Sequence, residues 1–389
     1  MLSSFRRWYQ FIAVTLVTTT ILFVLLNYLA LLGFAFKENI KPLLGSVNPV
    51  FAKYGEGIRI AYPDRSLDEI NALLGETWGR RLVYEPMTGM KEAPFKGQYV
   101  NVHEAGFRLS ANQGPWPPKR DFFNVFLFGG STLFGYGVAD HQTIASYLQI
   151  MLGKQLGRPV RVYNFGRGHY QSSLERLLFE KLLVSGYRPD AVIFVDGLND
   201  LINEIEFSPM GLGLEAEVGS GVASRLIALA SQLPLVRAAN WISLRLLSSS
   251  PSDVNTGSIS SKEDVDKKQE RMLARYVRNY HLSNHLAEFF QIPGVFVWQP
   301  VPYYNFDLSN NPLAKYDAGE HQYAGRGYEK MAMRLQKYPL DRNFVWCADI
   351  QKSLEKSLYV DAVHYSPKLA KAVAKCIVNA IIRRNLFWR

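Results

Sequence analysis

The stretch NVFLFGGSTLFGYG, residues 124–137, carries the clearest structural signal in the sequence. Its uninterrupted apolar run, Val125–Phe128, passes directly into Gly129-Gly130-Ser131-Thr132, which predicts a buried strand that ends in a tight turn. Ligands of open α/β sheets gather at the carboxyl ends of the strands, so a serine at this position is placed for chemistry. Because Gly-Ser-Thr is also common in ordinary turns, the role of Ser131 depends on what neighbouring segments bring to it.

Short apolar runs and amphipathic stretches alternate through the C-terminal part of the chain. Three further runs have the length and composition of buried strands, and four stretches are typical of helices. Strands that alternate with helices predict a parallel sheet covered on both faces, and therefore a three-layer α/β/α fold. The expected strands are Val125–Phe128, Val160–Tyr163, Ala191–Val195 and Val295–Trp298, and the expected helices lie at 144–152, 174–183, about 262–290 and about 367–382.

Polar groups follow two of these strands. PDAVIFVDGLNDL, residues 189–201, places Asn199 after a buried strand, where its side-chain N–H groups can stabilise a developing oxyanion. VYNFGRGHYQSS, residues 162–173, is a strand that enters a Gly-bearing loop and then a helix, where backbone N–H groups can bind negative charge. Taken singly, each of these features also has a purely structural explanation as a turn.

A fourth segment, YVDAVHYSP at residues 359–367, places Asp361 three residues before His364 and just ahead of the last expected helix. This spacing lets the carboxylate reach Nδ1 of the imidazole. Such a contact fixes the tautomer of the histidine and favours the imidazolium that forms when Nε2 accepts a proton from a serine. An Asp-x-x-His segment without a partner serine would carry little functional information.

In this order the four segments resemble the conserved blocks of the SGNH (GDSL-like) hydrolase superfamily, over about residues 122–388 apart from an insertion. The resemblance implies that Ser131 is the nucleophile and that its backbone N–H is one oxyanion donor. It implies that Asn199 is the side-chain donor. It also implies that His364 is the catalytic base and that Asp361 orients it.

The sequence departs from the family pattern at two places. The first block reads Gly-Gly-Ser-Thr instead of Gly-Asp-Ser-Leu. In the second block, counting from Asn164 places His169 where many members have the glycine that donates to the oxyanion, with Gly168 one residue earlier. A backbone N–H can serve from either residue, so Gly168 and His169 are both candidate donors.

The chemistry that the resemblance implies is acyl transfer through an acyl-Ser131 intermediate, to water in an esterase or to a sugar hydroxyl in an O-acyltransferase. The first-block variant and the N-terminal part of the chain also resemble bacterial membrane-tethered members that act on envelope or exported polysaccharides. We therefore expect an acyl ester, in particular an O-acetyl ester, of a cell-envelope glycan as the substrate. A lipid or lysophospholipid esterase is one alternative. A catalytically silent SGNH-like scaffold in a polysaccharide export or modification complex is the other.

An N-terminal apolar segment predicts a membrane anchor. The 26 residues from Phe11 to Phe36 carry no charge and would form a helix of about 39 Å, against a hydrocarbon core of about 30 Å. Arg6 and Arg7 precede it, so the positive-inside rule keeps residues 1–10 in the cytoplasm and places the chain beyond residues 11–36 outside it, in the periplasm of a Gram-negative cell. The alternative is a cleaved signal peptide, whose apolar region is usually shorter.

The remaining chain divides into an arm and a catalytic domain. Residues 37–118 are rich in Gly, Pro and aromatic residues and predict an ordered arm of short strands and turns, with a possible helix capping box at Ser66 and Glu69. Residues 119–389 form the expected catalytic domain. An insertion at about 207–261 interrupts it, with an apolar part that predicts a helical lid or a packed helix pair and a polar part that predicts a flexible loop.

Composition excludes several classes of function. The net charge of +10 is scattered, with no basic run and no zinc-finger spacing, so a nucleic-acid partner is not expected. His281 and His285 lie four residues apart but have no evident third ligand, so we expect no metal. There is no phosphate-binding loop or dinucleotide motif, and no cofactor is expected. Cys347 and Cys376 are either a disulfide or two buried thiols.

Overall fold

The computed structural model describes residues 2–40, 49–202, 233–236, 238–239, 262–313, 319–354 and 358–387. The predicted insertion at about 207–261 lies almost entirely outside these residues, and so do the lid and the flexible loop expected there. The chain divides into two units, one that contains the N-terminal helix and one, built from residues 47–208 and 260–389, that contains the sheet. We describe each unit separately.

The N-terminal unit contains one long helix, α1 (Leu2–Ile40). Within it, the most apolar 18-residue window of Arg6–Phe36 has a mean hydropathy of 2.1, and none of that window is buried against the rest of the protein. Leucine, valine, isoleucine and phenylalanine side chains along this segment are exposed. The helix is therefore long and apolar enough to cross a membrane, as the sequence predicted.

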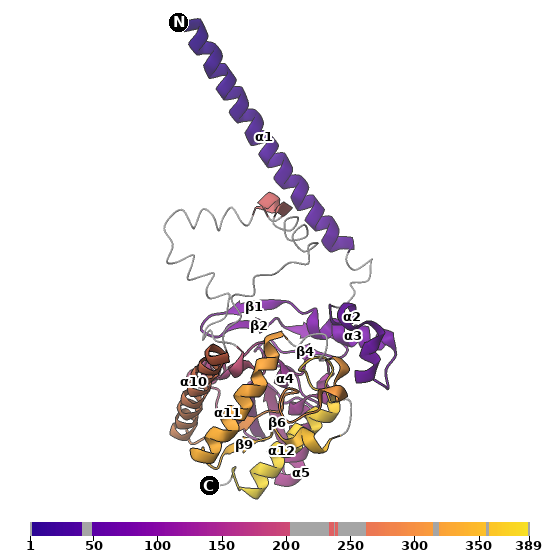
Figure 1. Cartoon of the computed structure of the whole chain (residues 1–389), viewed down its shortest axis with the longest axis vertical. Helices are drawn as coiled ribbons and strands as arrows, with labels where there is room; N and C mark the ends of the chain where they lie inside the picture. Colours follow the sequence, from indigo (N-terminus) through magenta and orange to yellow (C-terminus); the bar gives the residue numbers. More distant parts are fainter. Residues whose placement is uncertain are drawn as a thin grey trace. The chain divides into compact units, whose positions relative to one another are not determined.

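The second unit is built on a five-stranded, fully parallel sheet (Figure 1). The strand order is β6-β5-β7-β8-β9, so the strand that leads to Ser131 lies between the strands of the second and third sequence blocks. This order brings the carboxyl ends of all three to one part of the sheet edge. The strands are β5 (Phe123–Gly129), β6 (Val160–Asn164), β7 (Ala191–Asp196), β8 (Gly294–Trp298) and β9 (Phe344–Trp346).

Alternate residues of these strands point into two separate cores, as expected for a sheet covered on both faces. Phe126, Phe128 and Phe194 pack in one core, under α6 (Ser172–Val184), α10 (Lys262–Phe289) and α11 (Ala324–Lys337). Val125, Leu127 and Ile193 pack in the other, under α5 (Ile144–Leu156) and α12 (Pro367–Arg383). The prediction of a three-layer α/β/α fold is confirmed.

Two elements were not predicted from the sequence. β9 has only three residues, too few for a period to be visible. α11 begins AGRGYEK, and two glycines in the first turn and a half disfavour a helix. The structure explains them, because a Cβ at Gly325 would collide with the carbonyl oxygen of Tyr303, and one at Gly327 would collide with Gln269. Close packing therefore requires glycines that weaken the helical signal.

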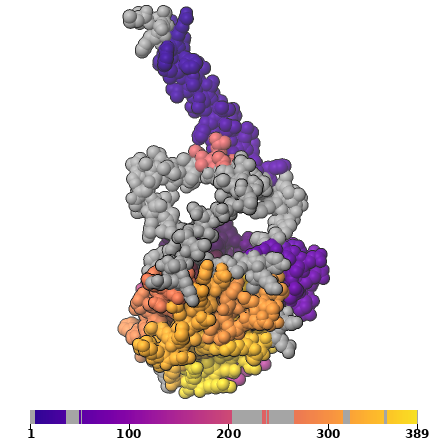
Figure 2. Space-filling model, in the orientation of Figure 1, coloured from indigo at the N-terminus to yellow at the C-terminus, as the bar shows by residue number. Residues whose placement is uncertain are grey.

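The arm that precedes the sheet is ordered and belongs to the same unit. Its helix α3 (Leu67–Trp78) starts with the capping box predicted at Ser66 and Glu69, with both reciprocal hydrogen bonds present. A core of arm residues around Ile58 and Leu73 includes Val360 from the histidine segment, and Figure 2 shows the arm in contact with the C-terminal part of the chain. The other arm elements are α2 (Pro49–Tyr54), the 3-10 turn Gly55–Ala61, β1 (Leu82–Glu85), β2 (Gly89–Glu92), β3 (Phe95–Lys96) and β4 (Asn101–Val102).

The arm also covers the edge of the sheet. β1 and β2 form an antiparallel hairpin, and β3 pairs with β4. Arg108 makes an antiparallel bridge with Asn164 at the end of β6, donating its backbone N–H to the Asn164 carbonyl at 2.9 Å. Because β6 is an edge strand, this pairing occupies backbone groups that would otherwise be open to another chain. The described short turns are Asp140–Gln142, Asn199–Leu201, Leu308–Asn310, Gly319–Tyr323, Ile350–Ser353 and the one-turn helix α4 (Ser131–Phe134).

Candidate active site

Ser131, His364 and Asp361 form a continuous hydrogen-bonded chain. His364 Nε2 lies 2.9 Å from Ser131 Oγ, and His364 Nδ1 lies 2.6 Å from Asp361 Oδ2. The other carboxylate oxygen, Oδ1, accepts the backbone N–H groups of Val363 and His364, each at 2.8 Å. With the carboxylate as acceptor at Nδ1, the proton of a neutral imidazole is placed there, and Nε2 is left to accept from serine.

Asp361 is held in its ionised form. Burial raises the pKa of its carboxyl group, but the contact with His364 and the hydrogen bonds from His364 and Val363 outweigh burial, so the pKa lies below its ordinary value. A permanently charged carboxylate beside Nδ1 stabilises a positive charge on the imidazole. Asp361 and His364 lie three positions apart because the turn between them places three donors around the Asp361 carboxylate.

The loop at the end of β5 positions Ser131, the candidate nucleophile. Ser131 is the first residue of α4, and Gly130 is its N-cap. A Cβ at Gly130 would collide with Asn199 Nδ2, so only glycine lets the Asn199 amide come this close to the residue before Ser131. Behind the loop, Thr132 donates its hydroxyl to Gln299 Oε1 at 2.7 Å. The serine is thus held by contacts on both sides of it.

The structure also brings the residues of the second and third blocks to this loop. Asn199 Nδ2 donates to the carbonyl oxygen of Tyr170 at 2.6 Å, which orients the amide and uses one of its two hydrogens. Gly168 donates its backbone N–H to Glu92 Oε1 at 3.1 Å. His169 has a φ of 62°, in the left-handed region that glycine occupies most readily. The N–H of Gly168 is therefore already bonded to a carboxylate from the arm.

The β1–β2 hairpin of the arm clamps this loop at three points. Besides the contact between Glu92 and Gly168, Arg167 Nη1 lies 2.8 Å from Glu85 Oε2, and the Tyr170 hydroxyl donates to the Thr88 carbonyl oxygen. Both Arg167 and Glu92 are buried. The hairpin is therefore part of the site. This could not be predicted from the sequence, since the hairpin residues lie far from all four blocks.

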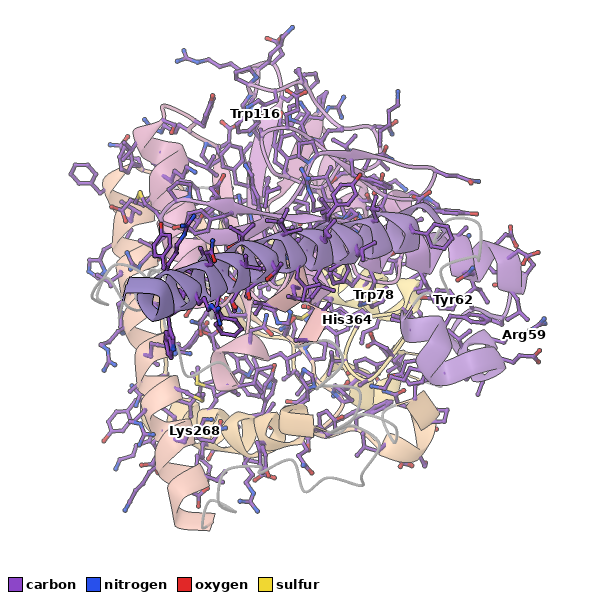
Figure 3. All side chains as sticks on the ribbon, turned by 90° about the horizontal axis from the view of Figure 1, so that it is seen from above. Arg59, Tyr62, Trp78, Trp116, Lys268 and His364 are labelled. Atoms are coloured by element: carbon purple, nitrogen blue, oxygen red, sulfur yellow. A yellow bond between two sulfur atoms is a disulfide. The ribbon has the colours of Figure 1, made fainter. Side chains whose placement is uncertain are left out.

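Two aromatic rings enclose the imidazole. Trp78, the last residue of α3, packs edge-on against His364 with ring centroids 5.6 Å apart, and the two labelled side chains lie together in Figure 3. Tyr136 stacks on His364 at 5.4 Å and donates its hydroxyl to Glu92 Oε1 at 3.1 Å. Glu92 therefore touches both the ring beside the histidine and the Gly168 loop. Sequence reasoning missed all three residues: Trp78 and Glu92 lie in no recognisable motif, and Tyr136 lies in the Ser131 stretch but was given no role there.

A cluster of three buried carboxyl groups lies behind the third block. Burial raises the pKa of Glu175 and of Asp196 well above their ordinary values. The charges of Asp196 and Asp200 raise the pKa of Glu175 further, and the charge of Asp200 raises that of Asp196, against a hydrogen bond with Glu175 that lowers it. Burial also raises the pKa of Asp200, although hydrogen bonds from Ser172 and the charge of Arg275 oppose it. Asp200 Oδ1 accepts the Ser172 hydroxyl at 2.5 Å. Since Asp200 follows Asn199 directly, this cluster supports the turn that carries the asparagine.

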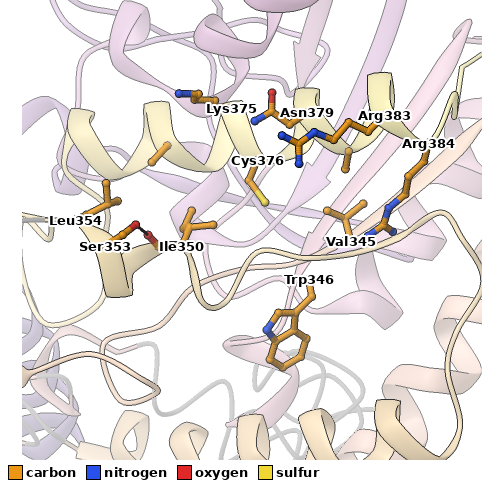
Figure 4. A pocket seen from close by; sticks show the side chains of 12 residues that line it. Val345, Trp346, Ile350, Ser353, Leu354, Lys375, Cys376, Asn379, Arg383 and Arg384 are labelled. Atoms are coloured by element: carbon orange, nitrogen blue, oxygen red, sulfur yellow. Dashed lines mark hydrogen bonds between the residues drawn. The ribbon is translucent and has the colours of Figure 1, made fainter.

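Other residues singled out in the sequence lie elsewhere. Cys347 and Cys376 form a disulfide that joins the chain after β9 to α12. It borders a surface pocket of about 490 Å³ that contains none of the candidate catalytic residues (Figure 4). His281 and His285 lie on α10, where His285 Nδ1 contacts the His281 carbonyl oxygen at 2.7 Å.

Comparison with known proteins decides the family. A model of GDSL-like lipases/acylhydrolases matches residues 125–377, more than half of the chain. The chain belongs to the GDSL-like lipase/acylhydrolase family. It is therefore an ester-hydrolysing enzyme, and the resemblance to SGNH hydrolases noted from its sequence blocks is confirmed. No curated protein matches the chain.

Several solved structures are similar to this GDSL-like enzyme, all at low identity. A lipase from a goat rumen metagenome is 11% identical with a TM-score of 0.40, over 66% of this chain and 97% of that chain. The psychrotrophic esterase EstA from Pseudoalteromonas is 11% identical with a TM-score of 0.33, over 68% and 98%. An acetylxylan esterase from Geobacillus stearothermophilus is 13% identical with a TM-score of 0.32, over 66% and 93%.

Proposed function

We propose that this GDSL-like enzyme is a serine esterase or O-acyltransferase that works through an acyl-Ser131 intermediate. The observation that carries the proposal is the unbroken contact chain from Ser131 Oγ through His364 to Asp361, with distances of 2.9 and 2.6 Å. In the proposed reaction His364 Nε2 takes the hydroxyl proton as Ser131 attacks the ester carbonyl. The imidazolium then returns a proton to the leaving alcohol.

The oxyanion of the tetrahedral intermediate would lie between three donors. Two are the backbone N–H of Ser131 and the second hydrogen of Asn199 Nδ2, whose first hydrogen holds the Tyr170 carbonyl. For the third we assign His169 rather than Gly168. The assignment is supported by the bond from Gly168 to Glu92 and by the left-handed φ of His169, a backbone conformation that suits the glycine usual at this position.

The proposed substrate is an acyl ester, and in particular an O-acetyl ester, of a cell-envelope or exported glycan. Support comes from the membrane-length apolar helix Arg6–Phe36 ahead of the enzyme and from the resemblance of this arrangement to membrane-tethered members of the family. With Arg6 and Arg7 before the apolar segment, we propose that the helix anchors the chain and that residues 37–389 lie outside the cytoplasm, in the periplasm of a Gram-negative cell.

The test is hydrolysis of short-chain aryl esters by the full chain in detergent, wild type against Ser131→Ala. We expect the variant to lose at least about 10³-fold in kcat, together with the covalent acyl-enzyme that mass spectrometry should detect in the wild type. Thr15→Ala, in the apolar helix, is a control that should retain full turnover. Turnover that does not depend on Ser131 would overturn the proposal.

A second comparison separates the possible acyl acceptors. An unacetylated oligosaccharide is added to the same reaction, and the fate of the acyl group is measured. An esterase should still release it as the free carboxylic acid, whereas a transferase should attach it to the sugar. Activity confined to long acyl chains would favour a lipid esterase instead. Retention of structure without any turnover or acyl-enzyme would leave a silent scaffold as the explanation.

A further inference from the structure

A second pocket, of about 390 Å³, lies between the arm and helix α6. Its lining includes arm residues from both ends of the β1–β2 hairpin and from residues 103–116, together with the second half of α6. None of Ser131, Asn199 or His364 lines it. In Figure 3, Trp116 of this pocket lies well apart from His364, so the pocket is distinct from the catalytic centre.

One buried carboxylate organises cations at this pocket. Glu85 contacts Lys91 Nζ at 2.8 Å, Lys181 Nζ at 3.2 Å and Arg167 Nη1 at 2.8 Å. Burial raises the pKa of Glu85, but Arg167 and the hydrogen bonds to its carboxylate outweigh burial and hold the pKa well below its ordinary value. With Glu104 counted as the other acid, the lining residues carry three positive charges and two negative ones. The pocket is therefore net positive at neutral pH.

The lysines are able to bind a further anion. Each ammonium group has three hydrogens, and the contact to Glu85 uses one. Their side chains are 19% and 35% exposed, so a ligand reaches them from solvent. Arg167 lies behind them and is only 1% exposed, and its Nε has no hydrogen-bond partner among the described residues. The three cations therefore carry more positive charge than the carboxylate of Glu85 neutralises, and more N–H groups than it can accept from.

Aromatic side chains form the rest of the wall. Trp116 and Tyr187 lie with ring centroids 4.6 Å apart, both half-buried, and His103 stacks on Phe107 at 4.6 Å. Flat rings pack against the C–H faces of a pyranose ring, while ammonium groups bind its carboxylate. The glycerol headgroup of phosphatidylglycerol has no ring and therefore no such flat face to bury.

We propose that this pocket binds a uronate residue of an acidic glycan, as a subsite remote from the catalytic serine. The identity of the ligand as a glycan rests on the proposed function. From the positive charge of the pocket we further infer that this glycan is anionic.

Arg167 connects the subsite to the catalytic loop. Its side chain lines the pocket, while its backbone N–H donates to the Gly129 carbonyl oxygen at 3.0 Å, two residues before Ser131. The next residue along, Gly168, is bonded to Glu92 of the same hairpin. The side chain and the backbone of Arg167 thus link the subsite to the loop that carries Ser131.

The experiment measures binding of trigalacturonate to the full chain in detergent micelles by calorimetry, with its fully methyl-esterified, uncharged form as the comparison. We expect the acid to bind at least about tenfold more tightly than the ester, with an advantage that shrinks at high salt. Lys181→Gln should weaken binding of the acid about tenfold. Lys154→Gln, on α5 and away from the pocket, should change nothing.

Three results would overturn the proposal. They are equal binding of acid and ester, equal binding by wild type and Lys181→Gln, or a Lys181-dependent interaction with phosphatidylglycerol vesicles but not with the trisaccharide. Binding does not require turnover, so the same titration with Ser131→Ala should give the wild-type affinity. If Ser131→Ala still hydrolyses esters, the proposed function fails while the binding result stands, which keeps the two failures distinguishable.

Discussion

The carboxylate of Glu92 lies 3.1 Å from the backbone nitrogen of Gly168 and accepts its hydrogen bond. The same oxygen accepts the hydroxyl of Tyr136, whose ring stacks on His364. One side chain from the arm therefore contacts two parts of the catalytic centre that are far apart in sequence. We infer that Glu92 is a positioning residue for both the oxyanion loop and the base.

Two substitutions of Glu92 should distinguish the effect of its hydrogen bonds on catalysis from the effect of its negative charge. In Glu92→Ala both hydrogen bonds are lost and two buried donors are unsatisfied, so we expect kcat to fall about tenfold or more with little change in KM. Glu92→Gln keeps a carbonyl oxygen at the same place and should restore most of the rate. The exposed Glu104→Gln serves as a charge control. A Glu92→Ala enzyme with wild-type kcat would show that the loop holds its shape without the hairpin.

Asp361→Asn should abolish most activity while leaving the fold intact. The amide oxygen can still accept from the backbone of Val363 and His364, but the amide N–H would face His364 Nδ1 and force the proton onto Nε2, which then cannot accept from Ser131. We expect kcat to fall about 10³–10⁴-fold at neutral pH with an unchanged melting temperature. Asp307→Asn, at an exposed turn, is the matched control. Activity within tenfold of wild type would count against the assigned tautomer.

The buried acid cluster predicts a pH-dependent stability. Burial raises the pKa of Glu175 in the folded protein. Below the ordinary pKa of about 4.3, the carboxyl group is protonated in both the folded and the unfolded protein, so the raised pKa does not lower the stability there. As the pH rises above that value, only the unfolded state ionises, so stability falls by about 1.4 kcal/mol per pH unit until the folded-state pKa is reached.

Glu175→Gln removes this ionisation and should be more stable than the wild type at pH 8, with a much smaller difference near pH 4.5. Urea unfolding followed by tryptophan fluorescence at the two pH values measures the effect. Glu180→Gln, on the solvent side of the same helix, should show no such dependence. Equal shifts at both pH values would indicate that the carboxyl group is already ionised when folded.

The disulfide between Cys347 and Cys376 predicts a redox-dependent stability. It closes a loop with a sequence separation of 29 residues, for which loop-closure entropy gives about 3–4 kcal/mol. Reduction, or the double substitution Cys347→Ala and Cys376→Ala, should lower the urea midpoint of inactivation accordingly. The reductant should have no effect on the double variant. An unchanged midpoint on reduction of the wild type would mean that the bond is not formed in solution.

Much of the fold could be predicted from the sequence because its signals are local. Each of the four long strands is an apolar run, and each predicted helix has a periodic apolar face. Within the site, Ser131, Asn199 and His364 follow or flank such elements, and the structure brings them together. Their roles remain a proposal until the substitutions above are made.

The rest could not be predicted because its cause is tertiary contact. Glu92 and Trp78 are ordinary residues in an arm without a motif, and only the packing of the arm gives them a place beside Gly168 and His364. The glycines of α11 weaken a helix that packing then enforces. The proposal of His169 over Gly168 as a donor likewise uses the position of Glu92, which the sequence does not reveal.

The hairpin contacts have a practical consequence for dissecting this protein. The family match begins at residue 125, which invites a recombinant fragment that starts there. Such a fragment would lack Trp78, Glu85 and Glu92, and would leave the edge strand β6 without Arg108. A piece that retains every contact described around the imidazole and the Gly168 loop must begin before Trp78, and one that keeps the whole of α3 with its capping box begins at Ser66 or earlier. The family match and the contacts that enclose the imidazole thus have different boundaries in this chain.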